Sequence, residues 1–168
     1  MSAVLLAFGC VKRAPEGGGS TAVPSNAGEI GSKAPNVELT DLEGKKVPLS
    51  DFAGKVVVLN FWATWCGPCR AEIPDLITLQ SKYGPQGVVV VGLSLDAEGA
   101  GIVKPFIQEH RVDYPMLIAD AATARQFGGI IGIPTTFVLD RQGRIVKKFV
   151  GRMELKAFEE AVQPLLAT

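Results

Sequence analysis

The 168-residue sequence has one histidine, three cysteines and no excess of either charge, and each shortage argues against a class of function. Its 17 basic residues balance 17 acidic ones, so nothing indicates nucleic-acid binding or a polybasic membrane patch. No stretch approaches the roughly 20 consecutive apolar residues of a membrane span. A structural zinc site needs four ligands, and beyond one close cysteine pair only Cys10 and His110 remain, so zinc is disfavoured.

Apolar residues, by contrast, are plentiful, and at 47% of the chain they are ample for a core. The length suits one domain plus a tail, without internal repeats. Strands and helices are expected to alternate, which predicts an α/β fold, and a closing hairpin makes the sheet mixed. The expected elements are a hairpin at 36–39 and 46–49, a short helix at 50–52, strands at 56–61, 87–95, 114–119, 135–139 and 144–150, and helices from the cysteines to about 83 and at 101–110, 121–127 and 154–166.

The stretch VVVLNFWATWCGPC at positions 56–69 is the one around which the chain is organised. Its apolar start is typical of a strand buried on both faces, and helical spacing follows the second cysteine. Cys66 and Cys69 therefore lie where a central strand meets a helix N-terminus. Unpaired N–H groups and the helix dipole lower the pKa of a thiol there. A structural disulfide would close only a very short loop, so a redox-active pair is the favoured interpretation.

The N-terminus predicts a separate leader. An apolar run at 3–9 ends in Gly9-Cys10, which resembles the end of a bacterial lipoprotein signal with Cys10 as the lipidated residue. The run is short and has no Lys or Arg before it, so an incidental cysteine is the alternative. Positions 11–34 are rich in Gly, Ser and Pro, as in a flexible linker. We therefore expect a signal-like segment at 1–10, a linker at 11–34 and a folded domain at 35–168.

Three motifs together resemble the thioredoxin superfamily: FWATWCGPC at 61–69, Pro74, and Ile133-Pro134-Thr135. The resemblance covers about residues 34–168 and is closer to the TlpA/ResA branch than to plain thioredoxin. LSDFAGK at 49–55 resembles that branch's lead-in, Glu72 matches a frequent glutamate, and the long interval before Pro134 leaves room for an inserted helix and strand. The resemblance implies a thioredoxin-like fold, with a central mixed β-sheet flanked by helices, an N-terminal β-hairpin and that central insertion.

The same resemblance implies roles for the cysteines and their neighbours. Cys66 would be the exposed nucleophile and Cys69 the less exposed resolving thiol. Pro134 would be a cis-proline facing them, leaving a polar backbone edge at Ile133 for substrate. The remaining expected substrate contacts are Trp65, whose alternative role is core packing, and the intervening pair Gly67 and Pro68. That pair matches thioredoxin's own and favours a reducing potential, near −270 mV rather than −120 mV on the scale of known family members.

Glu72 is a third catalytic candidate. Thioredoxins keep a buried aspartate where this chain has Asn60, and an amide cannot act as a base. Glu72 follows Cys69 by three residues and so shares its helix face. Burial there would raise the carboxyl pKa toward neutrality, where a general base works best. An exposed glutamate paired with a nearby cation is the alternative.

The expected function is an extracytoplasmic thiol–disulfide oxidoreductase that reduces protein disulfides without a cofactor or a bound metal. By resemblance, its substrates would include apocytochrome c, and a membrane thiol donor of the DsbD/CcdA kind would re-reduce it. We expect a monomer that meets the membrane only through an N-terminal lipid. A copper chaperone on this fold would need wider cysteine spacing and a histidine beside the pair. A peroxidase of the peroxiredoxin kind would need threonine three residues before the cysteine, whereas Thr64 is two before Cys66.

Overall fold

The computed structural model describes residues 26–167. Seven strands form one sheet in the order β2-β1-β5-β4-β3-β6-β7. β3 pairs in parallel with β4, and β4 with β5, while the other pairs are antiparallel, which confirms the mixed α/β sheet. The strands are β1 (Glu38–Asp41), β2 (Lys46–Pro48), β3 (Val56–Trp62), β4 (Val88–Ser94), β5 (Met116–Ile118), β6 (Thr135–Leu139) and β7 (Ile145–Val150).

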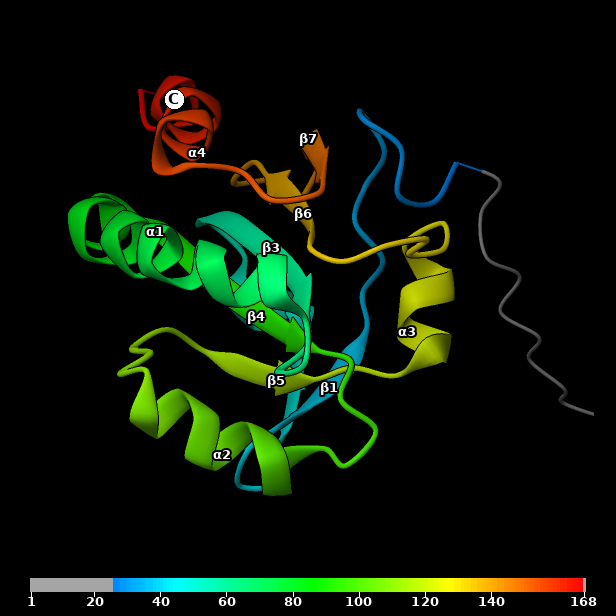
Figure 1. The fold of residues 1–168 in the computed structure, drawn as a ribbon. Coiled ribbons are helices and arrows are strands. Elements are labelled where there is room, and N and C mark those ends of the chain that lie inside the picture. The colour runs from blue at the N-terminus through cyan, green and yellow to red at the C-terminus, as the bar shows by residue number, and fades with distance from the viewer. Residues whose placement is uncertain (1–25, 168) are drawn as a thin grey trace, which may run out of the picture.

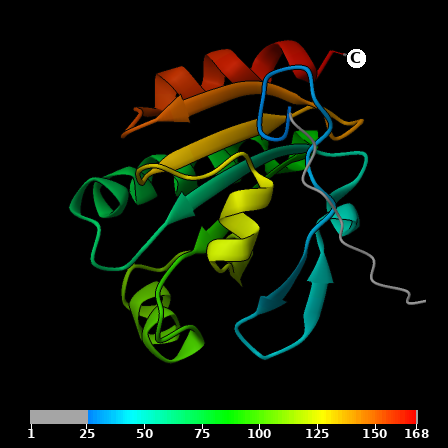
Figure 2. The same ribbon diagram turned by 90° about the vertical axis from the view of Figure 1, so that its right-hand side faces the viewer.

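Helices cover both faces of this sheet (Figure 1). They are α1 (Gly67–Tyr83), α2 (Ala100–Glu109), α3 (Ala121–Gln126) and α4 (Leu155–Val162), with short 3₁₀ helices at Leu49–Phe52, Gly84–Gln86 and Gln163–Leu165. α1, α2 and α4 pack on one face and share one apolar cluster. α3 lies on the other face, in front of the sheet in Figure 2, above a second cluster. All seven residues of β3 are buried because both faces are covered, as its apolar sequence predicts.

Several expected elements differ in extent from the structure. The first hairpin strand lies at Glu38–Asp41 instead of 36–39, and the strand expected at 87–95 covers Val88–Ser94. Two further elements are also shorter. The strand expected at 114–119 is limited to Met116–Ile118, although the Gly92 N–H donates to Pro115 O and the Ala119 N–H donates to Ser94 O at its two ends. Pro115 itself has no N–H to donate to a ladder. The helix expected at 154–166 ends at Val162 and continues as a 3₁₀ turn that contains Pro164. The proline cannot supply the next α-helical hydrogen bond. The helix after the cysteines reaches Tyr83 as expected and accommodates Pro74 within it.

Residues 26–34, expected as the end of the linker, contact the domain at two places. The Gly31 N–H donates to Ile145 O at 2.7 Å, and the Ile145 N–H donates to Ser32 O at 2.9 Å. Further back, the chain crosses the end of α3, where Gly28 and Gly128 both have positive φ. A Cβ atom on Gly28 would lie 2.0 Å from the backbone oxygen of Phe127, so only glycine fits this crossing.

Within residues 26–167, no helix has both the length and the hydropathy needed to cross a bilayer. Cys10 and the signal-like segment lie outside the described residues.

Candidate active site

The cysteine pair lies at the N-terminus of α1, directly after the turn that follows β3. Cys66 and Cys69 form a disulfide with their Cα atoms 5.3 Å apart. Cys66 is the N-cap of the helix, and its Sγ accepts a hydrogen bond from the Cys69 N–H at 3.2 Å. Gly67 and Pro68 occupy the first two helical positions, where a missing proline N–H costs nothing. The strand–turn–helix junction expected from the sequence is therefore present.

Both cysteines are largely covered in this oxidised form, with relative exposures of 5% for Cys66 and 2% for Cys69. Trp65, by contrast, is 70% exposed, which is at odds with a core-packing role. The Ile133–Pro134 peptide bond is cis, and Ile133 O lies 3.7 Å from Cys66 Sγ. The backbone segment expected to receive substrate is thus next to the expected nucleophile.

The cis-proline segment is held from β7. The Gly151 N–H, just beyond the end of β7, donates to Pro134 O at 2.8 Å, and Thr135 pairs with Val150. Ile131, on the approach to this segment, is 95% exposed. Ile131 could not be singled out from the sequence, because it lies in the run GGIIGI at 128–133 and nothing distinguishes it from the neighbouring isoleucines.

Glu72 is buried, with a relative exposure of 1%, so an exposed ion-paired glutamate is excluded. Its Oε1 accepts from Asn60 Nδ2 at 2.9 Å, and its Oε2 accepts from the Met153 N–H at 2.8 Å. Asn60 uses its second N–H to reach Thr136 Oγ1 on β6, also at 2.9 Å. Asn60, seen in the sequence only as a missing base, therefore connects the glutamate to the strand that begins at the cis-proline.

The pKa of Glu72 is raised from its ordinary value of 4.5 to about 7. Burial is the main cause, because desolvation penalises the carboxylate, and the charge of Asp75 adds to it. The hydrogen bonds from Met153 and Asn60 and the charge of Arg152 oppose this rise. The carboxyl group thus exchanges its proton near neutral pH, as the helix-face argument predicted for a buried Glu72.

Asp96 is a buried polar residue near the site that the sequence interpretation missed. It follows β4 directly, and its carboxylate is bound by the side chain and backbone of Thr64 and by Ser94. A possible signal was its position: it is the first charged residue after a buried parallel strand, at the edge where β3 also ends. Its partner Thr64 is 32 residues away in the chain, so the contact itself could not be predicted.

His110 has a structural environment. It forms the C-cap of α2, its Nδ1 lies 2.9 Å from Phe106 O, and its ring stacks on Phe106 at 4.0 Å between centroids. These contacts give His110 a role at the end of α2 and offer little to a copper site at the cysteines.

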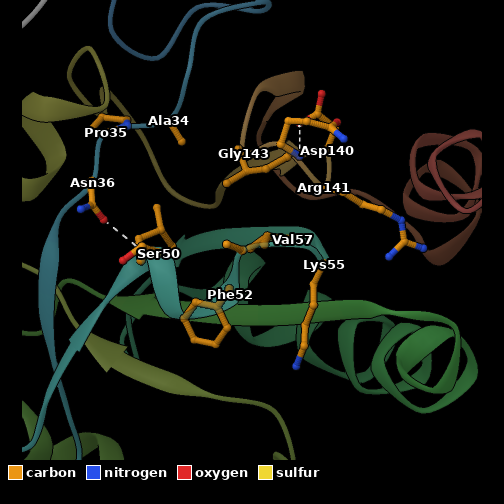
Figure 3. A pocket seen from close by; sticks show the side chains of 14 residues that line it. Ala34, Pro35, Asn36, Ser50, Phe52, Lys55, Val57, Asp140, Arg141 and Gly143 are labelled. Atoms are coloured by element: carbon orange, nitrogen blue, oxygen red, sulfur yellow. Dashed lines mark hydrogen bonds between the residues drawn. The ribbon is translucent and has the colours of Figure 1, made fainter. Parts of the chain in front are cut away.

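Figure 3 shows a pocket whose lining includes Val57, near the start of β3, whereas the disulfide follows the other end of this strand. Its lining includes Val57 and Leu139, which pair at the start of β3, whereas Phe61 and Thr135 pair at the cysteine end. None of its lining residues is a cysteine or a histidine. The candidate redox site is therefore a surface site at the other end of β3, independent of this pocket.

Comparison with known proteins agrees with this geometry. The Redoxin family profile matches residues 29–164. Thiol-disulfide oxidoreductase ResA of Bacillus thuringiensis subsp. konkukian is 38% identical over 137 residues, which cover 82% of this chain and 79% of that protein. ResA of Bacillus subtilis is 36% identical and covers 73% of this chain and 68% of its own length.

Solved structures of thiol-disulfide exchange proteins are also similar to this chain. A thioredoxin-family thiol:disulfide interchange protein from Chlorobium tepidum is 33% identical, with a TM-score of 0.73, and covers 83% of this chain and 99% of its own. A secreted thiol-disulfide isomerase from Corynebacterium glutamicum is 32% identical, with a TM-score of 0.75, and covers 80% and 85%. Together with the Cys66–Cys69 pair, these similarities confirm the expected activity class, which acts on disulfide-containing proteins. The chain belongs to the Redoxin family, within the thioredoxin superfamily, and is a thiol-disulfide oxidoreductase similar to ResA.

Proposed function

We propose that the protein reduces protein disulfides outside the cytoplasm, with Cys66 as the attacking thiol and Cys69 as the resolving thiol. The observation that carries this proposal is the position of Cys66 at the N-cap of α1, where its sulfur accepts the Cys69 N–H and lies beside Ile133 O. A hydrogen-bond donor and the helix dipole both stabilise a thiolate at that sulfur.

In the reduced protein, the Cys66 thiolate attacks one sulfur of a substrate disulfide. A mixed disulfide forms and the other substrate sulfur leaves as a thiolate. The Cys69 thiolate then attacks Cys66 Sγ, which releases the second substrate thiolate and forms the Cys66–Cys69 disulfide. Two electrons pass to the substrate, whose two thiolates take up protons. The exposed Trp65 and the backbone of Ile133 and cis-Pro134 would hold the substrate chain beside Cys66.

Glu72 is proposed as the base that accepts the proton of Cys69 in the second step. Its support is burial one helical turn after Cys69 together with a pKa of about 7. A carboxyl group poised near the ambient pH is suited to proton transfer. Asn60 does not act as a base in this proposal. Its amide instead donates a hydrogen bond to Glu72 Oε1 and holds that carboxyl group in place.

The finer assignments follow the resemblance to ResA and to a secreted relative. We propose apocytochrome c among the substrates and a DsbD/CcdA-like membrane thiol protein as electron donor. We further propose that Cys10 is lipidated and that residues 11–25 act as a tether, since residues 31–34 are hydrogen-bonded to the domain. Mass spectrometry of the membrane fraction from a bacterial host should find diacylglycerol on Cys10. An unmodified Cys10 in protein recovered from the soluble fraction would contradict the anchor while leaving the redox chemistry intact.

The central test is trapping. Cys69→Ala, expressed in the native host, should accumulate mixed disulfides through Cys66, and these should dissolve on reduction. Cys66→Ala is the matched control and should trap little, because Cys69 is more deeply covered. Recovery of the same partners from both variants would contradict the assigned order. A second outcome bears on the direction of electron flow. If the trapped partners become oxidised only when the protein is supplied in its disulfide form, the protein is an oxidant, and the reducing direction is contradicted.

A further inference from the structure

We propose that Asp96 is a positioning residue for the redox pair: its buried carboxylate fixes the turn of residues 63–65 and so sets the position from which Cys66 attacks. The proposal rests on the assignment of Cys66 as nucleophile and adds to it a residue from the loop that follows β4.

The hydrogen bonds of the Asp96 carboxylate are with this turn and with Ser94, the last residue of β4. Asp96 has a relative exposure of 3%. Its Oδ1 accepts from Thr64 Oγ1 at 2.7 Å, and its two oxygens lie 3.2 and 3.0 Å from the Thr64 backbone N. Its Oδ2 accepts from Ser94 Oγ at 2.8 Å, and Ser94 Oγ in turn accepts from the Asp96 N–H at 3.1 Å. One carboxylate therefore binds two donors of a single residue, Thr64, which fixes both its backbone and its side chain.

The turn that Asp96 holds leads directly into the helix cap. The Cys66 N–H donates to Ala63 O at 3.1 Å and closes the turn. The Leu95 N–H donates to Trp62 O at 2.9 Å and ties the start of the turn to the end of β4. Trp65, between Thr64 and Cys66, projects into solvent and can contribute little to the position of the turn. Asp96 thus supplies the side-chain hydrogen bonds that fix the segment just before the nucleophile.

A buried carboxylate is costly to keep for stability alone, because desolvation opposes its charge and apolar packing is often as stabilising. Thr64 and Ser94 compensate that cost with directional hydrogen bonds, and such bonds specify a geometry. A displacement of a reacting atom by about 1 Å can cost up to roughly a hundredfold in rate. Because Asp96 holds the turn next to Cys66, a small displacement of that turn should change the rate at which Cys66 attacks.

Two substitutions separate position from charge. Asp96→Asn keeps one oxygen for the Thr64 hydroxyl and amide, and its new N–H can donate to Ser94 Oγ. Asp96→Ala removes every contact of the carboxylate and leaves only the backbone N–H bond to Ser94 Oγ. We expect Asp96→Ala to slow alkylation of the Cys66 thiolate by iodoacetamide about tenfold and to move the midpoint potential, while Asp96→Asn stays within about threefold of wild type. The rate is measured against pH, so that a change in thiol pKa is separated from a change in access or orientation.

Asp120 provides a matched control, because its Oδ1 also accepts from the backbone N–H and the Oγ1 of one threonine, Thr123, at the start of α3. Asp120→Ala should lose stability without a change in Cys66 reactivity. Thr64→Val removes only the 2.7 Å hydroxyl contact and should slow Cys66 by a smaller factor than Asp96→Ala. It serves as the test variant if Asp96→Ala fails to fold.

The proposal is overturned if Asp96→Ala, or Thr64→Val in its place, leaves both the Cys66 rate and the potential at wild-type values. It is equally overturned if Asp96→Asn loses as much as Asp96→Ala, since the charge rather than the position would then matter. The readout uses a small alkylating reagent, so it does not depend on the reducing direction or on any protein substrate. Those parts of the proposed function are tested separately by trapping.

Discussion

Glu72 and Asp96 are both buried carboxylates near the redox pair, and their partners assign them different tasks. Among residues 26–167, Glu72 accepts hydrogen bonds from two N–H donors, those of Asn60 and Met153, and desolvation raises its pKa to about 7. Asp96 receives the hydroxyls of Thr64 and Ser94 in addition to a backbone N–H. Glu72 is thus placed to change its protonation state, whereas Asp96 is placed to hold a turn.

Glu72 should make the stability of the oxidised protein depend on pH. Because its folded-state pKa lies above its unfolded value, its contribution is fully favourable below about pH 4.5 and is lost as the pH rises to about 7. The full shift corresponds to about 3 kcal/mol. Glu72→Gln should remove this loss, so its stability relative to wild type should be greater at pH 8 than at pH 5 in urea unfolding. The oxidised form is used because its disulfide cysteines do not titrate. An equal difference at both pH values would contradict the raised pKa.

Asn60 should tune the same carboxyl group. Asn60→Ala removes the N–H that stabilises the charged form at Oε1, so the pKa of Glu72 should rise further. Carboxyl titration by NMR measures this directly, and the pH profile of mixed-disulfide resolution should move in the same direction. Thr136→Val is the control, because it removes the other acceptor of Asn60 and leaves the bond to Glu72. A lowered pKa in Asn60→Ala would show that better solvation of Glu72 outweighs the lost bond.

At the scale of elements, the position of the two cysteines on α1 determines which of them reacts first. Cys66 is its N-cap, and Cys69 lies within the first turn and is more deeply covered. Alkylation of the reduced protein near pH 7, mapped by mass spectrometry, should therefore modify Cys66 at least about ten times faster than Cys69. Equal rates would argue against the helix-cap assignment.

α4 contributes to stability through its buried face. Phe158 is fully buried and meets Phe149 of β7 edge to face, with ring centroids 5.7 Å apart. Phe158→Ala should lower the free energy of unfolding by about 3–5 kcal/mol, since it leaves a cavity between α4 and the sheet. Lys156→Ala, an exposed position on the same helix, should stay within about 0.5 kcal/mol. A small loss for Phe158→Ala in denaturant unfolding would mean that α4 can move to fill the space.

The elements also show what the sequence could predict. The apolar run of β3 and the spacing after Cys69 were enough to place the strand–turn–helix junction, because local pattern determines both. Strand lengths were less predictable, since the pairing of β5 depends on neighbours on β1 and β4 that lie far away in the chain. The same distinction between local pattern and distant contacts applies to the site residues. Glu72 follows from helix spacing, whereas the Asp96–Thr64 and Met153–Glu72 bonds join segments distant in sequence.

At the scale of the whole molecule, the two ends of β7 serve different parts of the chain. Its end at Val150 pairs with Thr135 beside the cis-proline, and its start at Ile145 binds the leading segment at Gly31 and Ser32. The attachment of the leading segment is therefore separated from the redox end by the length of the strand. A chain held by residues before Asn26 would present its cysteines at the end of β7 away from that attachment.

The glycine crossing at Gly28 and Gly128 has a mechanical consequence. A pull on residues before Asn26 would reach this crossing first, then the bonds at Ile145 and Ala34, and only afterwards the core. We call the crossing of Gly28 and Gly128, together with the hydrogen bonds of the Ile145 and Ala34 amides, the clasp. Gly28→Ala should weaken the clasp and speed hydrogen exchange at these two amides. Gly44→Ala, between β1 and β2 and away from these bonds, is the control, with a similar positive φ and open space around its Cβ position. If the Ile145 and Ala34 amides exchange at the same rate in both variants, the crossing does not stabilise the attachment of the leading segment. If Gly28→Ala alone exchanges faster, the clasp acts as a strain relief that keeps tension on a tether away from the redox pair.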